Sequence, residues 1–594
     1  MRPNRPGMPP LGKAKNFKNS IKSLLNYTKP YLGFIILSMI FAIICTSITI
    51  IGPSLIEDIT NLLSKNLEGE IPLDKIIKIA TILGSLYVLS LILNYLTSFT
   101  MATVTRYISR NLRRDISRKI NLLPFSYLDS NSHGDILSRI TNDVDTVSQS
   151  LDQSVITLIT ATLLFIASLI IMFIKNWILA LCSIGASLIG FVLTAIILKF
   201  SQKHFVGVQQ SLGELNGHNA EMYGGHNIIK AYNAEKQATE KFNIINKKFY
   251  KSAWRAQFLS GLMGPIMNFV GNFSFVVICI VGGILIINGS EDIGTIAAFV
   301  MYNRYFSQSL NQLAQLTTSI QSLAAASERV FDILNQEELE NEDHKTTKIT
   351  NCSGAVEFKN VKFGYTQDKL IIKDFSVSVK PGQKVAIVGP TGAGKTTLVN
   401  LLMRFYEISE GQILIDNINT KSITRENLHD QFAMVLQDTW IFKGTVKENI
   451  IYNQENVTDD QVKEACKTVG IHHFIKTLPQ GYDTILDENT TISAGQKQLL
   501  TIARAMIQNS NILILDEATS SVDTRLEILI QEAMDKLTKN RTSFVIAHRL
   551  STIKNADIIL VMKDGDVVES GNHNELLNLN GFYAELYNSQ FSEN

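Results

Sequence analysis

Six long stretches almost free of charged residues dominate the first half of this 594-residue chain. Each is close to the roughly 20 residues that an α-helix needs to cross a bilayer, and no stretch of that length follows residue 353. The first half is therefore predicted to be a helical transmembrane domain in a lipid bilayer. The predicted spans are Gly33–Ile56, Ile79–Thr105, Ser154–Ile174, Trp177–Leu198, Gly261–Ile287 and Gly294–Leu323, of which the last is the least apolar.

The loops between the spans alternate in length and in charge. Only Lys175 and Asn176 separate the third and fourth spans, whereas about fifty residues separate the second from the third and the fourth from the fifth. The segment before the first span and these two long loops contain seven, seven and nine Lys or Arg residues, against four in the opposite loops. Because basic residues near span ends stay cytoplasmic, both termini of this multi-pass protein are predicted to face the cytoplasm. The long loops are rich in helix formers and are expected to extend the span helices into the cytoplasm.

A glycine-rich loop in the second half predicts a nucleotide triphosphate site. The pattern G-x-x-x-x-G-K-[ST] is met at every fixed position by the run Gly389-Pro390-Thr391-Gly392-Ala393-Gly394-Lys395-Thr396-Thr397. In such a loop the backbone N–H groups surround the phosphates, Lys395 places a positive charge at the terminal phosphates, and Thr396 offers a hydroxyl to Mg²⁺. The apolar run Lys384–Val388 before the loop predicts a buried parallel strand, and the residues after it follow helical spacing. The second half is thus predicted to be an α/β domain.

Two adjacent carboxylates, Asp516 and Glu517, end another apolar strand. Parallel strands present catalytic groups at their carboxyl ends, so both acids are expected beside the phosphate loop. Consecutive side chains of a strand diverge. Asp516 could therefore hold Mg²⁺ through its water shell while Glu517 acts as general base on the attacking water. The alternative, two acids opening a solvated turn, is outweighed by the buried strand and the phosphate loop that precede them.

The order of these motifs resembles the nucleotide-binding domain of an ABC transporter, and the resemblance covers nearly the whole chain. It implies that ATP is the nucleotide, that Tyr365 stacks on adenine and that Gln437 contacts Mg²⁺ and lies against the membrane domain. It also implies that His548 contacts the γ-phosphate and that Asp523 lies in a loop that crosses to a partner domain. Without the resemblance Tyr365 would be interpreted as a core aromatic and His548 as a structural histidine.

The signature segment of that family normally reads Leu-Ser-Gly-Gly-Gln, and the matching stretch here is Ile492-Ser493-Ala494-Gly495-Gln496. In the family this segment opens a helix whose N–H groups hold the γ-phosphate of ATP bound to the other subunit. Ala494 in place of the first glycine adds a Cβ near that phosphate and disfavours any φ > 0 geometry by roughly 1 kcal/mol. Both glycines of the family's upstream Val-Gly-Glu-x-Gly motif are also absent from Ile485–Asn489. The expected catalytic residues are nevertheless intact: Lys395, Gln437, Asp516, Glu517 and His548.

An intact catalytic set with an altered signature suggests an unequal pair of subunits. The chain resembles one subunit of a heterodimeric bacterial multidrug ABC exporter, the one that carries the catalytic Glu. The implied partner is a second half-transporter with a normal signature and a replaced catalytic carboxylate, and a homodimer that tolerates the alanine is the alternative. The implied function is ATP-driven efflux of drugs or other amphipathic compounds across the cell membrane by alternating access. A lipid or peptide exporter and an ATP-gated regulator that moves no substrate are the competing interpretations, and no nucleic acid is expected to bind.

Two cytoplasmic stretches, Phe125–Arg139 and Leu215–Lys230, resemble the segments through which such exporters couple the membrane domain to the ATPase domains. In the sixth span a polar stripe recurs at i, i+4, i+7 and i+11, which places its members on one side of a helix: Arg304, Gln308, Asn311 and Gln315. Because a polar stripe that faces lipid is costly, it is expected to face either a water-filled cavity or a neighbouring helix.

These observations divide the chain into a cytoplasmic segment (1–30), a six-span transmembrane domain (31–330), a linker (331–352) and an ABC nucleotide-binding domain (353–594). The linker includes the charged run Glu337–Lys345, which has no apolar period and is expected to be solvated. The five cysteines are scattered, and they predict neither a disulfide nor a metal site.

Overall fold

The computed structural model describes residues 16–66, 71–366, 369–437, 439–487, 492–516, 524–547 and 550–591. The chain forms two compact units. The first contains Met1–Leu123 and Asn131–Glu337, and the second contains Pro124–Ser130 and Glu338–Asn594. The second unit therefore includes a short segment from the first half of the sequence, Pro124–Ser130, which belongs to one of the two long polar loops.

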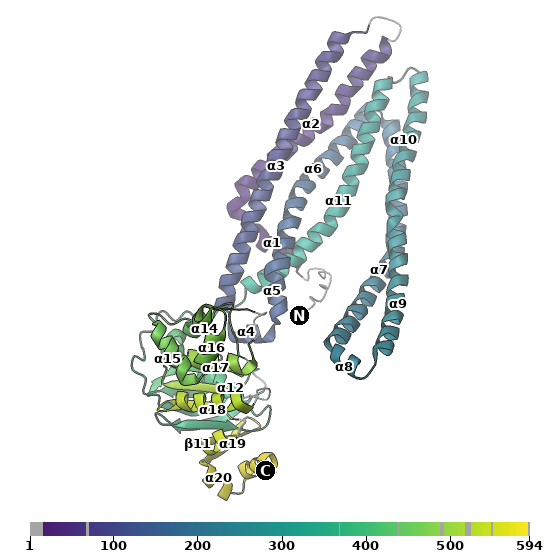
Figure 1. The fold of residues 1–594 in the computed structure, drawn as a ribbon. Helices are drawn as coiled ribbons and strands as arrows, with labels where there is room; N and C mark the ends of the chain where they lie inside the picture. The colour runs from purple at the N-terminus through teal and green to yellow at the C-terminus, as the bar shows by residue number, and fades with distance from the viewer. Residues whose placement is uncertain are drawn as a thin grey trace. The chain divides into compact units, whose positions relative to one another are not determined.

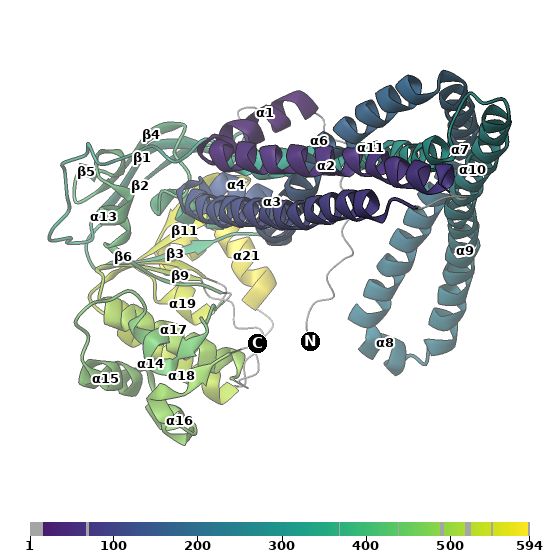
Figure 2. The ribbon, with the colours of Figure 1, turned by 90° about the horizontal axis from the view of Figure 1, so that it is seen from above.

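The first unit consists of helices (Figure 1). Their bounds are α1 Phe17–Thr28, η1 Lys29–Tyr31, α2 Leu32–Lys65, α3 Leu73–Leu122, α5 His133–Ser138, η2 Arg139–Asp143, α6 Val144–Lys175, α7 Trp177–Gly224, α8 His226–Ala231, α9 Glu235–Gly261, α10 Met263–Ile287 and α11 Ile293–Leu334. Within this unit α2 lies along α3, α11 lies along α6 and α2, and α7 lies along α9 and α10 (Figure 2).

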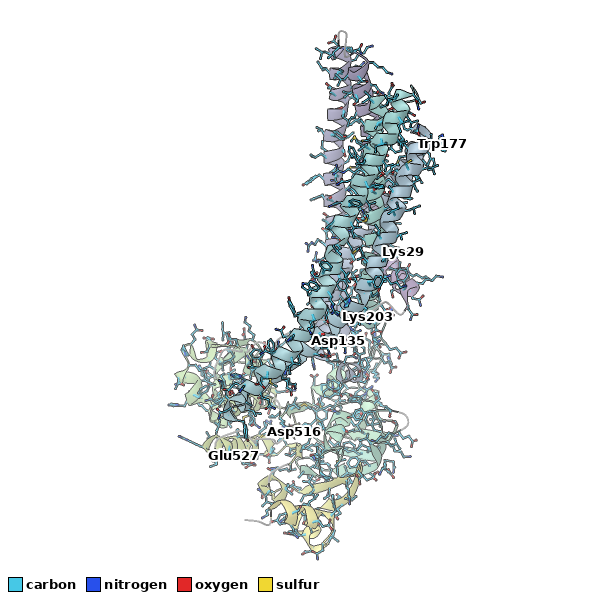
Figure 3. The ribbon with its side chains drawn as sticks, turned by 90° about the vertical axis from the view of Figure 1, so that its right-hand side faces the viewer. Lys29, Asp135, Trp177, Lys203, Asp516 and Glu527 are labelled. Carbon is cyan, nitrogen blue, oxygen red and sulfur yellow. The ribbon has the colours of Figure 1, made fainter. Side chains whose placement is uncertain are left out.

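The predicted spans correspond to α2, α3, α6, α7, α10 and α11. In the described part of the chain five helical segments are long and apolar enough to cross a membrane, and α11, the least apolar predicted span, is not among them. Asn176 alone separates α6 from α7 and caps α7 by accepting hydrogen bonds from Ile178 N and Leu179 N. Figure 3 shows Trp177, at this turn, and Asp135 near opposite ends of the unit, as the predicted alternation of short and long loops requires.

Large apolar side chains cover the outside of these helices. On α3, for example, Val88, Leu91 and Tyr95 are all exposed. A water-soluble protein rarely presents a continuous apolar surface of this kind, so these side chains are suited to contact lipid. The helices also continue well beyond the predicted spans, since α3 runs to Leu122 and α7 to Gly224. The expected helical extensions are thereby confirmed.

The second unit contains a six-stranded, mostly parallel sheet in the order β12-β11-β3-β10-β9-β6 and an antiparallel sheet in the order β2-β1-β4-β5. The strands are β1 Val356–Phe363, β2 Ile372–Val379, β3 Lys384–Val388, β4 Glu410–Ile415, β5 Ile418–Asn419, β6 Phe432–Val435, β7 Gly444–Thr445, β8 Ile485–Leu486, β9 Ile512–Asp516, β10 Thr542–Ile546, β11 Ile558–Lys563 and β12 Asp566–Gly571. The helices are α4 Phe125–Ser130, α12 Lys395–Leu402, η3 Thr420–Ser422, α13 Arg425–His429, α14 Val446–Ile451, α15 Asp459–Val469, α16 His472–Thr477, η4 Gly481–Asp483, α17 Ala494–Gln508, α18 Thr524–Thr538, α19 Leu550–Lys554, α20 His573–Asn578 and α21 Phe582–Phe591.

The six-stranded sheet places the carboxyl ends of its central strands side by side. Strand β3 pairs in parallel with β10 and β11, and β9 pairs in parallel with β10 and β6. Both faces of these strands are buried, as Val385, Ile514 and Phe544 illustrate, which is why each reads as an uninterrupted apolar run. The residues that follow β3, β9, β10 and β6 therefore meet at one edge of the sheet.

The connector between the units is less solvated than its sequence suggests. Residues 331–334 complete α11, and Glu342 in the charged run is only 9% exposed at its side chain. Its carboxylate lies 2.7 Å from both Arg404 Nη2 and Arg425 Nη1 and 2.9 Å from Lys345 Nζ. The expectation of a solvated run is wrong at this residue, because basic groups from the folded domain surround it.

Candidate nucleotide-binding site

The phosphate loop lies between β3 and α12, where the sequence predicts it. Gly394, the residue before α12, has a φ of 100°, which a residue with a Cβ adopts only at a cost. A Cβ on Gly389 would collide with the main-chain oxygen of Met562 in the neighbouring strand β11. The glycines at these two positions are therefore required by the backbone geometry. The loop leaves the first N–H groups of α12 pointing outward, as an anion site at a helix N-terminus needs.

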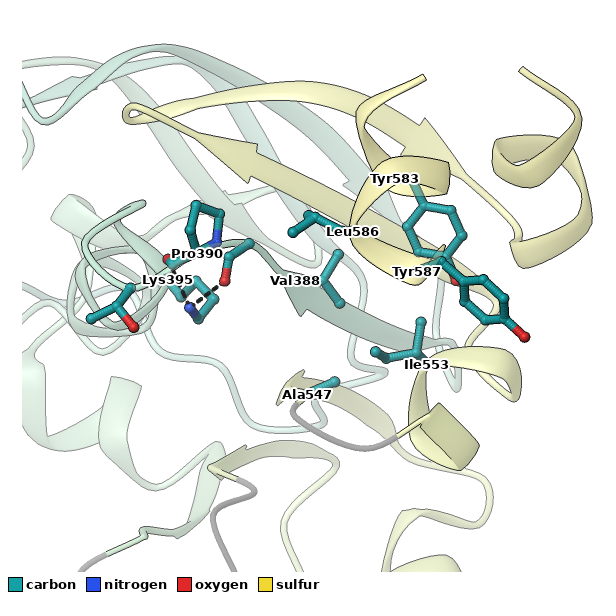
Figure 4. Close-up of a pocket in the computed structure, with 10 residues that line it drawn as sticks. Val388, Pro390, Lys395, Ala547, Ile553, Tyr583, Leu586 and Tyr587 are labelled. Carbon is teal, nitrogen blue, oxygen red and sulfur yellow. Dashed lines mark hydrogen bonds between the residues drawn. The ribbon is translucent and has the colours of Figure 1, made fainter. Parts of the chain in front are cut away.

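Lys395 bends back over the loop that precedes it. Its Nζ donates hydrogen bonds to the main-chain oxygens of Gly389 at 2.7 Å and Pro390 at 3.1 Å (Figure 4). Burial lowers the pKa of Lys395, and the negative charge of Asp516 partly opposes that effect. The ammonium group is thus held at the centre of the loop, where it can meet the negative charge of a phosphate.

A cavity of about 490 Å³ opens on the outer side of the loop. The predicted residues that line it are Tyr365, Thr391, Gly392, Gly394, Lys395, Thr396, Thr397, Gln437 and Asp516. Gln437 follows β6 and Asp516 ends β9, so both reach the cavity from the carboxyl ends of parallel strands. The hydroxyl of Thr396, the side-chain oxygen of Gln437 and the carboxylate of Asp516 are the oxygen donors that Mg²⁺ prefers. The cavity thus fits a magnesium nucleotide.

Tyr365 lies at the cavity rim after β1 and is 49% exposed. The alternative interpretation of Tyr365 as a core aromatic is therefore wrong. Its ring packs edge-on against Phe363 and Tyr406, with centroid separations of 5.0 Å in each pair. Its hydroxyl lies 3.1 Å from Thr397 Oγ1 on α12. These contacts fix the ring while one side stays open, an arrangement suited to stacking on a nucleotide base.

Two apolar residues of the cavity were missed in the sequence, namely Ile371, just before β2, and Ile546, at the end of β10. An isoleucine beside a strand gives no signal that separates a cavity wall from the core. Three predicted residues, Glu517, Asp523 and His548, lie outside the residues that the structure describes. Their roles stay predictions. Glu517 follows β9, Asp523 precedes α18, and His548 is two residues beyond the end of β10.

The signature residues form the start of α17 and do not line the cavity. Ser493 is the N-cap: its side chain accepts a hydrogen bond from Gln496 N at 3.2 Å, while the side chain of Gln496 accepts one from Ser493 N at 2.9 Å. Ala494 is the first residue of the helix and is not among the described residues with positive φ. The expected backbone penalty at Ala494 is therefore wrong, because an alanine fits this helical position. Ser493 and Ala494 are exposed, whereas Gly495 is buried.

A second, smaller cavity lies between the phosphate loop and helix α21. A cavity of about 120 Å³ separates Val388, Pro390 and Lys395 from Tyr583 and Leu586 on α21 (Figure 4). Tyr583 Oη lies 2.7 Å from His573 Nδ1, and burial raises the pKa of Tyr583 to about 12. This cavity has room for only a few water molecules, whereas the cavity of about 490 Å³ is of the size that small ligands occupy.

The short helix α4, part of the first predicted coupling segment, packs within the second unit. Phe125 stacks on Phe405 with a centroid separation of 5.2 Å and meets Tyr406 edge-on at 6.0 Å. Tyr406 Oη donates a hydrogen bond to Asp129 at 3.0 Å. Because Tyr406 also touches Tyr365, a chain of aromatic contacts connects α4 with the nucleotide cavity. In the second predicted coupling segment, α8 follows α7 directly, and Ile228 on it is exposed.

Both halves of the chain match models of known protein families. Residues 35–310 match the family model described as "ABC transporter transmembrane region", and residues 372–520 match the one described as "ABC transporter". The chain is 37% identical over 584 residues to the uncharacterised ABC transporter ATP-binding protein YfiC of Bacillus subtilis, covering 98% of this chain and 96% of that protein.

Two further relatives have names that state a substrate. The "Fatty acid ABC transporter ATP-binding/permease protein" of Mycobacterium bovis is 45% identical over 476 residues, which cover 80% of this chain and 75% of that protein. The "ATP-dependent lipid A-core flippase" of Haemophilus influenzae is 35% identical over 517 residues, which cover 86% of this chain and 88% of that protein.

Proposed function

This chain belongs to the ABC transporter family as an exporter-type half-transporter, and on that premise we propose that it pairs with a second, different half-transporter to expel drugs or other amphipathic compounds. The protein is a multi-pass plasma-membrane ATPase with a cytoplasmic ATPase domain that uses ATP and Mg²⁺. The observation that carries the proposal is the cavity in which Lys395, Gln437 and Asp516 converge on one phosphate loop, within a chain that also holds long apolar helices.

The chain's own residues divide the work of hydrolysis. The N–H groups at the start of α12 and the ammonium of Lys395 bind the phosphates, and Tyr365 presents its ring to the base. Mg²⁺ held by Thr396, Gln437 and Asp516 would neutralise phosphate charge there. Glu517 takes the proton of the attacking water, and His548 holds the γ-phosphate. Hydrolysis then removes the contacts that keep two ATPase domains closed.

Transport follows from the different contacts that ATP makes in two states of the dimer. In the closed state ATP touches the phosphate loop of one subunit and the signature helix α17 of the other, whereas in the open state it touches only one of them. A ligand can shift an equilibrium only through such a difference in affinity. Closure moves the coupling segments, including α4 with its Phe125 contacts, and the membrane helices open outward.

The proposed heterodimer rests on Ala494. This residue is exposed at the first turn of α17 and does not line the cavity of its own chain, which supports a role for its Cβ at the nucleotide of the partner. That nucleotide site is then weakened, while the site of this chain faces the partner's signature. A homodimer, the alternative, would carry two weakened sites. A neighbouring reading frame that encodes a half-transporter with a normal signature and a replaced carboxylate would support the unequal pair.

Hydrolysis and transport by the purified dimer test the proposal. Glu517→Gln should retain ATP binding, lose at least about 100-fold in hydrolysis and accumulate in the closed state. Inverted membrane vesicles should take up an amphipathic dye with ATP for the wild type and not for the variant. Undiminished ATP turnover in Glu517→Gln would contradict the assignment of Glu517 as the general base. ATP hydrolysis without uptake of any dye or lipid would favour a regulator that moves no substrate.

Lipid export is a second candidate, and the relative named a fatty acid transporter favours it. The mechanism of ATP hydrolysis and the vesicle assay are the same for both candidate functions. Uptake of a fluorescent fatty acid in place of the dye would distinguish them, because a drug exporter should prefer the dye and a lipid exporter the fatty acid.

A further inference from the structure

Arg304 is the only Asp, Glu, Lys or Arg within the six predicted spans. It lies eleven residues after Ile293, the first residue of α11, which corresponds to about 16 Å along the helix. Counted from the start of α11, this distance is about half of the roughly 30 Å hydrocarbon core of a bilayer. An arginine at this depth costs about 3 kcal/mol or more unless water, a ligand or a counter-charge meets it.

One face of α11 is fully engaged with its own chain. Tyr302, Asn303, Phe306 and Ser309 are buried there. Asn303 Nδ2 donates a hydrogen bond to Ser274 Oγ on α10 at 3.1 Å, and Asn303 Oδ1 accepts one from Ser183 Oγ on α7. This face fixes the rotation of α11, since turning the helix would bury Arg304 in place of Asn303.

The opposite face carries the polar stripe. Arg304, Gln308, Asn311 and Gln315 are all exposed. Within the described residues, no hydrogen bond or ion pair joins their side chains to another helix of the chain. The stripe therefore does not serve helix-to-helix bonding inside this subunit. It starts near mid-membrane and runs for about 16 Å toward the cytoplasmic end of the span.

No acidic side chain of the predicted spans can serve as a counter-charge for Arg304. None of the six spans contains an acidic residue, so a second copy would have no carboxylate at this depth. A single arginine balances one negative charge and offers paired N–H donors to a carboxylate. A phosphate monoester carries a charge of about −1.5 to −2 at neutral pH. The three neutral amides of the stripe could not balance the negative charge that Arg304 leaves uncompensated.

We propose that Arg304 binds the carboxylate of a transported long-chain carboxylic acid, with the amides of Gln308, Asn311 and Gln315 forming the polar path along which that headgroup arrives from the cytoplasmic side. The proposal rests on the export function and narrows its substrate to a single-chain acid.

Equilibrium binding to the assembled full-length dimer in phosphatidylcholine nanodiscs tests the site, with empty nanodiscs as background. The probes are radiolabelled oleate and oleyl alcohol, which share a tail and differ in charge. The wild type should bind oleate at least about tenfold more tightly than oleyl alcohol, since a hydrogen-bonded charge is worth that much. Arg304→Gln should lose this preference, and Arg304→Lys should retain much of it.

Arg255→Gln is the matched control, because it removes an exposed arginine from α9 outside the predicted spans. It should leave both affinities and the ATPase rate unchanged. Equal binding of the two probes by the wild type overturns the proposal without any variant. Unchanged oleate preference in Arg304→Gln also overturns it. A third result would also overturn the proposal: the Arg304→Gln dimer dissociates, while the separated Arg304→Gln subunit still binds the probe. Arg304 would then form an ion pair with an acidic residue of the partner subunit.

ATP hydrolysis in the same nanodiscs separates this proposal from the export function. Hydrolysis without charge-selective binding would support the export function and contradict the proposed carboxylate site at Arg304. The opposite result is also informative: the wild-type dimer does not hydrolyse ATP but binds oleate selectively through Arg304. This result would support the carboxylate site and contradict the export function.

Discussion

Replacement of Glu342 by glutamine should strongly destabilise the ATPase unit. The Glu342 side chain is 9% exposed, and its Oε1 lies 2.7 Å from Nη2 of Arg404, which is itself only 5% exposed. Oε2 accepts a hydrogen bond from the backbone N–H of Arg425 at 2.6 Å. Removing one partner from such a buried cluster costs about 3–5 kcal/mol. Glu407 remains 2.8 Å from Arg404 Nε and offsets part of that loss, so we expect about 2–3 kcal/mol.

The cluster also makes a prediction about pH. Burial by itself raises the pKa of Glu342, but hydrogen bonds from Lys345 and from the backbone of Arg425, together with the charges of both arginines, lower it below its ordinary value of 4.5. A carboxylate whose pKa is lower in the folded state stabilises that state above the unfolded pKa, and this contribution is lost as the pH falls through the folded pKa. The difference between the wild type and Glu342→Gln should therefore be full at neutral pH and shrink below pH 4.5.

Heating of the full-length protein while a fluorescent ATP analogue is bound gives a readout specific to the ATPase unit. A loss of about 2–3 kcal/mol should lower the midpoint by about 5–10 °C for a domain of this size. Glu410→Gln is the control, because its pair with Lys362 is 2.6 Å long but 66% and 37% exposed at the two side chains. An exposed pair contributes at most about 1 kcal/mol. Equal midpoint shifts for Glu342→Gln and Glu410→Gln would refute the reasoning.

Three further changes test the site and its connections. Lys395→Ala should lower ATP hydrolysis by about 100-fold or more without unfolding the domain, because the charge at the centre of the loop is lost; near-normal turnover would contradict that role. Phe125→Ala removes two aromatic contacts worth about 0.5–1.5 kcal/mol each, so vesicle uptake should fall more than ATP hydrolysis does, and a parallel fall in both would argue against coupling through α4. Ala494→Gly should raise hydrolysis by the assembled dimer about two- to fivefold, since a closer approach of helix N–H groups is worth up to about 1 kcal/mol; no change would show that the Cβ is harmless.

The membrane helices and the phosphate loop could be predicted because their signals are local. A helix that crosses a bilayer must be apolar along its whole length, so α2, α3, α6, α7 and α10 are visible in composition alone. The loop around Lys395 needs glycines at fixed spacing. Asp516 could be placed because it ends a buried strand, and parallel strands bring their carboxyl ends to one edge. Tyr365 and Gln437 needed the family resemblance, since neither carries a local signal of its own.

The sequence by itself determined that the first half is a helical membrane domain, that the second half is of the α/β class and what chemistry the phosphate loop offers, because each depends on residues that are neighbours in the chain. Only the tertiary structure decided that Glu342 meets Arg404 and Arg425, that Phe125 joins the aromatic group around Tyr406, and that the polar stripe with Arg304 faces away from its own subunit. These contacts join segments tens or hundreds of residues apart. No local pattern encodes them, because they arise from the packing of whole helices and sheets against one another.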